Sequence, residues 1–460
     1  MRTNLLQTDK IIPIISLCLL LLPSVRSEKI FANINDKWEY SEKVKKEFLH
    51  AWNSYKKYAW GHDELKPLSK TYHDWYKESL LMTPIDGYDT MVLMGLKKEA
   101  EEDKQLILGR LSFDKDMEVQ AFEITIRELG GLLSSYELNH DKRFLNLAID
   151  LGNRLLPIFN SPTGMPYRYV NLKTGVTRDS ISNPAEIGSL TLEFGTLTKL
   201  TGNPKYFAKA KKAVTTLFNK RSSIGLVGTW INVNTGQWGD KDSHISGGID
   251  SYYEYLLKSS LLFNANDFKK MWDESVKAVN KYLTDSVNDE LWYGHANMDS
   301  GVITGKFFGA LDAYFPAELA LSGNLKRAEE LENSCYRMWL YYGIEPEQIN
   351  YETMAIIDPQ YYLRPENIES NYYLYKFTHR TEYLCRAETY FNTLVYNCRT
   401  KNGYVSLNDV RTKEKIDEMP SYFLAETLKY LYLTFAPDSV FDFKSHIFNT
   451  EAHPLEKYFR

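Results

Sequence analysis

Hydrophobic positions follow a helical period along most of the chain. Ile126, Leu129, Leu133 and Tyr136 recur at spacings of three and four residues, which is the apolar stripe of an amphipathic α-helix. A polar turn follows, and a second stripe of the same kind begins at Phe144. The pattern therefore predicts two helices joined by a short turn.

This helix–turn–helix unit recurs at intervals of roughly sixty residues, with polar turns at 138–144, 200–207, 262–268, 321–328 and 377–384. Helix pairs in series either stack as an open solenoid or close into a ring of inner and outer helices, an α/α toroid. The Gly-, Asn- and Thr-rich segments 160–175 and 225–238 separate the pairs. They predict loops or short hairpins at one end of such a ring.

The first residues predict a secretory signal peptide. Arg2 and Lys10 precede an apolar run over 11–22, and "PSVRS" offers small residues for cleavage. The run is shorter than the roughly twenty residues that span a bilayer. We expect a signal peptide over 1–27 and one domain over 28–460; an uncleaved anchor is the alternative. The sequence has no Asn-x-Ser/Thr site, which favours export to a bacterial periplasm or exterior over the lumen of a eukaryotic endoplasmic reticulum (ER).

Charge and composition indicate which classes of partner the protein can bind. The net charge is −5 and no long basic run occurs, which argues against nucleic acid. The 33 Tyr and 9 Trp suit either a Tyr-rich core or a surface for polar ligands with apolar faces, such as sugars. Cys385 and Cys398 bracket a helical stretch that would separate them by about 20 Å. We expect them and Cys335 to be free thiols without a metal role.

Carboxylates fall at equivalent places in the pattern. Glu123, Asp250 and the pair Glu366 and Glu369 lie about fourteen to eighteen residues ahead of their turns, near the N-terminal ends of the predicted inner helices. Capping or first-turn roles would explain each one singly, and surface ion pairs are a further alternative. Together they predict acid/base chemistry on a polyhydroxylated substrate at one mouth of the toroid.

Extended motifs then resemble one family. The stretches "FEITIRELGG", "NPAEIGSLTLEFGTLTKLTGNPKY", "GIDSYYEYLLK", "LRPENIES", "MPSYFLAETLKYLYL" and "FNTEAHP" occur in order between about residues 40 and 454. They are similar to the class I α-mannosidases, glycoside hydrolase family 47. The resemblance implies an all-α (α/α)7 barrel, a Ca2+ ion in its mouth, and removal of terminal α-1,2-linked mannose with inversion. Mannose-rich oligosaccharides and glycoprotein N-glycans are the implied substrates.

The resemblance also implies roles for residues. Glu123 matches the general acid and Glu366 the base, while Asp250 matches a third catalytic carboxylate whose share in the acid role stays open. Thr450 matches the direct protein ligand of Ca2+. Further motif positions contact the terminal sugar or order the waters around the ion: Arg127, Arg364, Glu369, Tyr422, Glu426 and Glu451.

The chain also departs from the family pattern. Cys335 matches one half of a disulfide, but Ala313 stands at the partner position, and Ala310 aligns with a His that faces the sugar. Here the chain looks more like the ER degradation-enhancing mannosidase-like branch and bacterial relatives. A mannose-binding quality-control lectin with little turnover is therefore the alternative function, and a different α/α-toroid glycosidase is a third. We expect a monomer.

Overall fold

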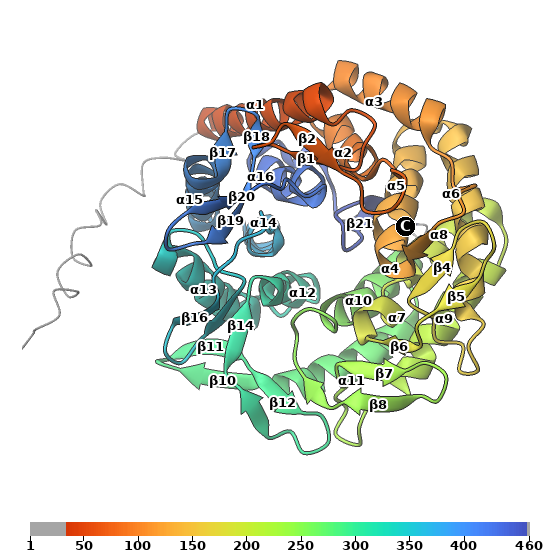
Figure 1. Ribbon diagram of the computed structural model, residues 1–460. Helices are drawn as coiled ribbons and strands as arrows, with labels where there is room; N and C mark the ends of the chain where they lie inside the picture. Colours follow the sequence, from red (N-terminus) through yellow and green to blue (C-terminus); the bar gives the residue numbers. More distant parts are fainter. Residues whose placement is uncertain (1–33, 458–460) are drawn as a thin grey trace, which may run out of the picture.

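The computed structural model describes residues 34–457, which fold into a ring of seven helix pairs, an (α/α)7 barrel (Figure 1). The inner helices are α2 (Met82–Leu93), α5 (Gly130–Asn139), α8 (Thr191–Thr201), α10 (Asp250–Phe263), α12 (Phe315–Leu321), α14 (Glu366–Thr378) and α16 (Leu428–Phe435). The outer helices are α1 (Ile34–Tyr58), α3 (Lys97–Arg110), α6 (Lys142–Leu155), α9 (Lys205–Phe218), α11 (Asn266–Tyr282), α13 (Leu325–Tyr342) and α15 (Thr381–Cys398). The predicted signal peptide over 1–27 lies outside the described residues.

All five turns predicted from the sequence join an inner helix to the following outer helix. Four of them contain a residue in the left-handed conformation directly after the inner helix: His140, Gly202, Asn264 and His379. A left-handed residue at this place satisfies the last helical carbonyls and reverses the chain. Closure of the ring comes from α1, which packs against α16 from the other end of the chain (Figure 1). The toroid is thus the correct alternative, and the solenoid is wrong.

Short antiparallel strands form small sheets that connect the pairs. Residues 160–175 and 225–238 contribute to two of them, which confirms the predicted hairpins. The strands are β1 (Glu64–Lys66), β2 (Thr71–His73), β3 (Glu118–Gln120), β4 (Tyr169–Asn171), β5 (Thr177–Arg178), β6 (Ile181–Ser182), β7 (Trp230–Asn232), β8 (Gln237–Asp240), β9 (Asp242–Ser243), β10 (Thr284–Val287), β11 (Glu290–Tyr293), β12 (His295–Asn297), β13 (Ile303–Gly305), β14 (Phe307–Gly309), β15 (Gln348–Asn350), β16 (Ala355–Asp358), β17 (Arg399–Thr400), β18 (Gly403–Tyr404), β19 (Ser406–Asp409), β20 (Glu414–Ile416), β21 (His446–Phe448) and β22 (Pro454–Glu456).

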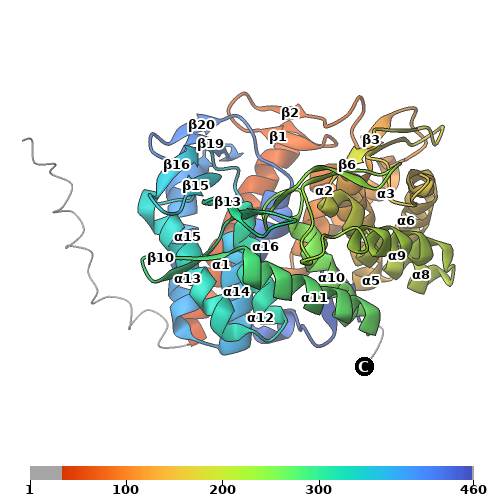
Figure 2. The ribbon, with the colours of Figure 1, turned by 90° about the horizontal axis from the view of Figure 1, so that it is seen from below.

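The C-terminal hairpin β21–β22 inserts residues 449–453 into the barrel. Figure 2 shows the dark blue ribbon of the described C-terminal tail on the side opposite the β1–β2, β15–β16 and β19–β20 hairpins. Phe448 is fully buried and stacks on Phe441 with ring centroids 3.9 Å apart. Phe448 thus anchors the tail through apolar contacts.

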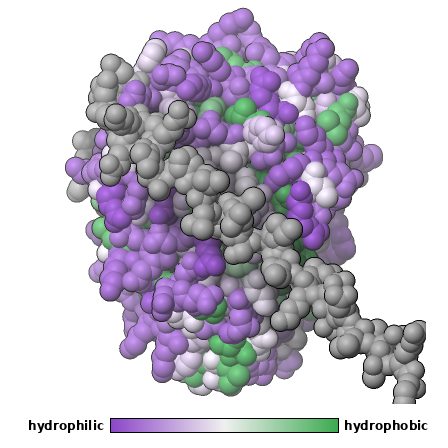
Figure 3. Space-filling view, turned by 90° about the vertical axis from the view of Figure 1, so that its left-hand side faces the viewer, coloured by the Kyte–Doolittle hydropathy of each residue, from purple (hydrophilic) through white to green (hydrophobic). Residues whose placement is uncertain are grey.

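The view in Figure 3 is mainly hydrophilic, with small separate hydrophobic groups. Within residues 34–457, no helix is long and apolar enough to cross a membrane. Cys335, Cys385 and Cys398 form no disulfide within the described residues, as predicted, and the last two lie on the single helix α15.

Candidate active site

Three carboxylates from three separate inner segments line one pocket of about 290 Å³. Glu123 lies in the short helix α4 (Ala121–Ile124), which runs through a π-helical turn (Thr125–Leu129) into α5. Asp250 is the first residue of α10 and Glu366 the first residue of α14. The convergence predicted from their spacing is confirmed. Each side chain is half-buried, as a group that faces a pocket should be.

Burial raises the pKa of Asp250 and of Glu366. For Asp250, desolvation outweighs the hydrogen bond from the Ser251 N–H, and the pKa rises to about 7. For Glu366, desolvation outweighs the attraction of Arg364, and the pKa also rises to about 7. Carboxyls that exchange protons near neutral pH are suited to general acid–base catalysis.

Two arginines flank the ring of Tyr422. The Arg127 guanidinium lies 5.6 Å and that of Arg364 5.7 Å from the ring centroid. Arg364 donates from Nε and Nη2 to Glu347, both at 3.0 Å, in a fork-like contact that fixes its plane. The hydroxyl of Tyr422 donates to the carbonyl of Tyr362 at 2.7 Å. All three sequence-predicted residues, Arg127, Arg364 and Tyr422, therefore lie at the pocket in held orientations.

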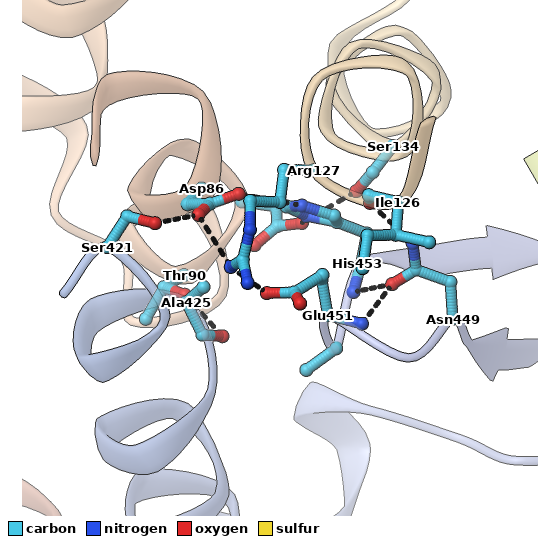
Figure 4. Close-up of polar contacts among 12 residues, drawn as sticks. Asp86, Thr90, Ile126, Arg127, Ser134, Ser421, Ala425, Asn449, Glu451 and His453 are labelled. Carbon is cyan, nitrogen blue, oxygen red and sulfur yellow. Dashed lines mark hydrogen bonds and ion pairs between the residues drawn. The ribbon is translucent and has the colours of Figure 1, made fainter. Parts of the chain in front are cut away.

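Arg127 also joins the pocket to the C-terminal tail. It donates to Glu123 from Nε at 3.0 Å and to Glu451 from Nη1, and Nη1 lies 3.5 Å from Asp86 (Figure 4). Burial raises the pKa of Glu451 to about 8, against the attraction of Arg127. One guanidinium thus ties a pocket carboxylate, the tail and α2 together.

The inner end of the pocket is rich in oxygen atoms. A side space of about 40 Å³ is lined by Asp250, Glu254, Glu366, Glu369, Glu426 and Thr450, among others. Glu369 and Glu426 are buried, and desolvation raises the pKa of each, to about 8 for Glu369. Oε2 of Glu366 is buried without a hydrogen-bond partner in the described chain.

A buried lysine offsets part of this negative charge. Lys258 is fully buried and lies 2.5 Å from Glu254, 3.5 Å from Glu318 and 3.9 Å from Glu369. Buried carboxylates without enough cations are costly. An additional cation with a preference for oxygen ligands therefore fits the donor set at Thr450, and Ca2+ has that preference.

A buried cluster of charged residues holds the C-terminal tail in place. His453 lies 2.6 Å from Asp89 through Nδ1 and 3.3 Å from Asp86 through Nε2, and all three are fully buried (Figure 4). Lys429 contacts Asp89 at 2.7 Å and donates to the carbonyl of Ala452. Burial opposes a charged imidazole, but Asp89 and Asp86 overcome it and raise the pKa of His453 to about 9. His453 therefore has a structural role, in which its ring contacts hold the tail against α2.

Two glycines let the tail approach. A Cβ on Gly130 would lie 2.5 Å from Nδ2 of Asn449, and one on Gly131 would lie 3.1 Å from Cε1 of His453 and 2.5 Å from Ile85. The paired glycines of "RELGG" are thus required where the tail crosses α5. Asn449 in turn donates to the carbonyl of Ile126 at 2.8 Å.

The structure shows where Ala310 lies relative to the pocket. Ala310 is fully buried and does not line the pocket, whereas its neighbour Leu311 does. The segment turns into the short helix Leu311–Tyr314, which points the residue after Ala310 toward the cavity. The pocket wall at this place is therefore an apolar leucine.

Several supporting residues were missed by the sequence analysis: Asp86, Asp89, Lys258, Glu347 and Lys429. A signal existed for the first two, because "PIDGYDTMV" places two acidic residues three apart in an otherwise apolar helix. Buried acids on an inner helix require partners. Some of those partners, such as His453, lie more than 300 residues away, and even Arg127 and Ser134 lie more than 40 residues away.

The fold and site define a glycoside hydrolase. The model of glycosyl hydrolase family 47 matches residues 47–457, and the chain belongs to this family. Alpha-mannosidase I MNS5 of Arabidopsis thaliana is 36% identical over 449 residues, covering 91% of this chain and 77% of that protein. ER degradation-enhancing alpha-mannosidase-like protein 1 of Schizosaccharomyces pombe is 34% identical over 96% of this chain, which spans 59% of that longer relative.

A solved structure agrees along nearly the whole barrel. The alpha-1,2-mannosidase from Trichoderma reesei superposes with a TM-score of 0.85 at 30% identity, covering 91% of this chain and 99% of that one. The match confirms the (α/α)7 barrel that the motifs implied.

Proposed function

We propose that this protein is a Ca2+-dependent exo-glycosidase that hydrolyses terminal α-1,2-linked mannose with inversion. The observation that carries the proposal is the meeting of Glu123, Asp250 and Glu366 with Thr450 in one pocket. The names of the Trichoderma and Arabidopsis relatives support mannose as the sugar, and the name of the Trichoderma enzyme also supports the α-1,2 linkage. Mannose-rich oligosaccharides and glycoprotein glycans are the proposed substrates.

In the proposed reaction Glu123 gives a proton to the leaving glycosidic oxygen while the bond from that oxygen to C1 breaks. Glu366 removes a proton from the water whose oxygen forms the new bond to C1 on the opposite face. Asp250, whose pKa near 7 lets it hold a proton at neutral pH, shares in delivery of the proton to the leaving group.

Binding of the terminal sugar is assigned to the pocket residues around these carboxyls. Arg127, Arg364 and Tyr422 present two guanidiniums and an aromatic ring to the sugar, and Glu369, Glu426 and Glu451 are hydrogen-bond acceptors for hydroxyls and waters. Thr450 would hold Ca2+, because its side chain and the surrounding carboxylates are oxygen donors. A bound Ca2+ would supply extra coordination for sugar hydroxyls.

An exported location follows from the predicted signal peptide. The relatives described above are eukaryotic, and one is named for ER degradation. The ER lumen therefore replaces the bacterial periplasm as the proposed compartment.

The test is digestion of α-1,2-, α-1,3- and α-1,6-linked mannobiosides, followed by NMR to identify the first anomer released. We expect cleavage of the α-1,2 compound with release of β-mannose, and loss of activity in EGTA that Ca2+ restores. Thr450→Val should lose activity and the response to Ca2+ together. Full activity in EGTA would refute the calcium assignment.

Glu366→Gln separates hydrolysis from binding. The variant keeps the shape of the side chain but cannot accept the proton of water, so we expect loss of turnover with retained binding of mannobiose. A wild-type protein that binds mannobiose and does not cleave it would instead support the lectin alternative. An unchanged rate in Glu366→Gln would refute its role as base.

A further inference from the structure

A second cluster of chemically active side chains lies outside the pocket, on the sheet β13–β12–β9. In the antiparallel register, Ser243 of β9 faces Ala296 of β12, and Asp242 faces Asn297. Continuing this register by one pair brings His244 opposite His295. Because alternate residues of a strand share a face, Asp242 and His244 project to the same side as His295.

The side chains meet as the register predicts. The two imidazoles are stacked, with centroids 4.4 Å apart and planes 25° apart. Nδ1 of His295 lies 2.6 Å from Oδ2 of Asp242. One ligating atom from each of Asp242, His244 and His295 lies within 4.8 Å of the other two. A tetrahedral ion with bonds of about 2.0 Å places its ligand atoms about 3.3 Å apart, so small side-chain rotations suffice.

Unused ring nitrogens supply an independent observation. His244 is only 6% exposed, and its Nδ1 makes no well-formed hydrogen bond in the described chain, although the backbone of Ser246 lies close to the ring. Nε2 of His295 is likewise buried and unpaired there. Buried ring nitrogens are normally satisfied, and two unsatisfied ones in stacked imidazoles indicate a missing electrophilic partner.

Surrounding hydroxyls already hold the remaining donor groups in place. Thr304 donates to Oδ1 of Asp242 at 2.8 Å, which leaves the other carboxylate oxygen toward His295. Thr229 lies 3.2 Å from Nε2 of His244 and donates to the carbonyl of Asp242 at 2.8 Å. Outer hydrogen bonds of this kind orient metal-binding imidazoles and carboxylates.

We propose that Asp242, His244 and His295 form a binding site for a divalent cation of the zinc class. Two imidazoles and one carboxylate suit Zn2+, Co2+ or Ni2+, whereas Ca2+ takes oxygen ligands only. The site is thus chemically distinct from the oxygen-rich inner end of the pocket at Thr450. A water molecule completes the fourth position.

The position of the cluster indicates a structural role. The ion would join β9 to β12, two strands separated by about fifty residues of sequence. The segment after β9 carries Gly247 and Gly248, which line the pocket, and leads to Asp250 at the start of α10. Cross-linking β9 would restrict the segment that forms one wall of the pocket.

The test is calorimetric titration of the full, tag-free chain with ZnCl2 in a buffer that contains excess CaCl2. We expect one Zn2+ per chain, and a thermal midpoint that rises with Zn2+ because the ion binds the folded state. Titration with Co2+ should give the visible absorption of a four-coordinate site. Failure of the wild-type chain to bind Zn2+ in calcium would overturn the proposal.

Variants locate the site. His244→Ala and His295→Ala should each weaken Zn2+ binding by more than about 100-fold, and Thr304→Val by roughly tenfold. His73→Ala removes an exposed imidazole from β2 and should bind as the wild type does. Unaltered Zn2+ affinity in both ligand variants would refute the assignment. The far-UV circular dichroism of each variant, compared with that of the wild type, shows that the barrel is folded.

This inference does not depend on mannosidase activity. A chain that binds Zn2+ through these residues but leaves mannobiose intact would sustain the metal site and refute the proposed function. A chain that hydrolyses mannobiose but binds no Zn2+ would support the proposed function and refute the metal site.

Discussion

Nδ1 of His453 lies 2.6 Å from Oδ2 of Asp89, and this contact fastens the C-terminal tail to inner helix α2 beneath the pocket. Three residues earlier in the same tail, Thr450 lines the pocket itself. A terminal segment, which in most domains is only loosely held, is therefore part of the barrel core.

The first prediction concerns the pH dependence of this lock. The pKa of His453 is about 9 in the folded protein, against about 6.5 in the unfolded chain. Because folding raises this pKa, the protonated imidazole contributes its full stabilisation of the folded protein below pH 6.5. This contribution is lost as the pH rises through 9. The contribution is at most about 3 kcal/mol. Urea unfolding between pH 6 and 9.5 should show that the free energy of unfolding of the wild type falls with pH relative to that of His453→Gln. Parallel pH dependences of the two proteins would contradict a stabilising contact between protonated His453 and Asp89.

The second prediction tests the close approach of the tail to α5. Gly130→Ala would place a Cβ 2.5 Å from Nδ2 of Asn449. That amide is held by the Ile126 carbonyl and by Glu193, at 2.8 and 2.9 Å. We expect a loss of about 2 kcal/mol in the free energy of unfolding, together with lower activity.

Gly109→Ala is the matched control for Gly130→Ala. Gly109 lies in α3, and an added Cβ would meet nothing within 4 Å. This change should be neutral or stabilise by about 0.5–1 kcal/mol, because alanine favours a helix. Equal effects of the two variants on stability would show that Asn449 tolerates the added methyl group.

The third prediction concerns Lys258, which is buried among the pocket carboxylates. Lys258→Met removes the cation beside Glu254, Glu318 and Glu369 and leaves their charges uncompensated. We expect a loss of about 3–5 kcal/mol in the free energy of unfolding. The loss should be greater at pH 8 than at pH 6, because burial raises the pKa of Glu369 to about 8 and its carboxyl is protonated at pH 6.

Lys326→Met is the corresponding surface change. The Lys326 side chain is 89% exposed and lies 3.9 Å from Glu330, so its removal should alter stability by less than about 0.5 kcal/mol. If the two variants had equal free energies of unfolding, Lys258 would not be needed to offset the charge of the pocket carboxylates. The carboxyls would then become protonated without a loss of stability.

The fourth prediction concerns the acidic side of the pH–rate profile. A base must be deprotonated, so kcat/KM should fall as the pH drops through the pKa of Glu366, about 7. The negative charge of Glu347 helps to raise that pKa. Glu347→Gln should therefore move the acidic limb to lower pH. Glu352→Gln, an exposed change near the same hairpin, should leave it in place; an immobile limb in both would rule out Glu366 as the titrating base.

The sequence alone determined the features that depend on short-range periodicity. Apolar spacings of three and four, interrupted by polar turns, predicted the helix pairs, and the position of Glu123, Asp250 and Glu366 ahead of those turns predicted one shared mouth. These predictions succeeded because a helix repeats every 3.6 residues and rises 1.5 Å per residue. The apolar spacing therefore fixes which face of the helix a residue lies on, and its distance from the turn fixes which end it occupies.

Tertiary structure alone decided which distant residues meet. The pairing of His453 with Asp89 spans 364 positions, and the zinc-class cluster joins β9 to a strand about fifty residues later. Leu311 rather than Ala310 faces the pocket because a helical turn begins there. Ring closure and strand register set these contacts, and both follow from packing of the whole barrel, which local sequence patterns do not encode.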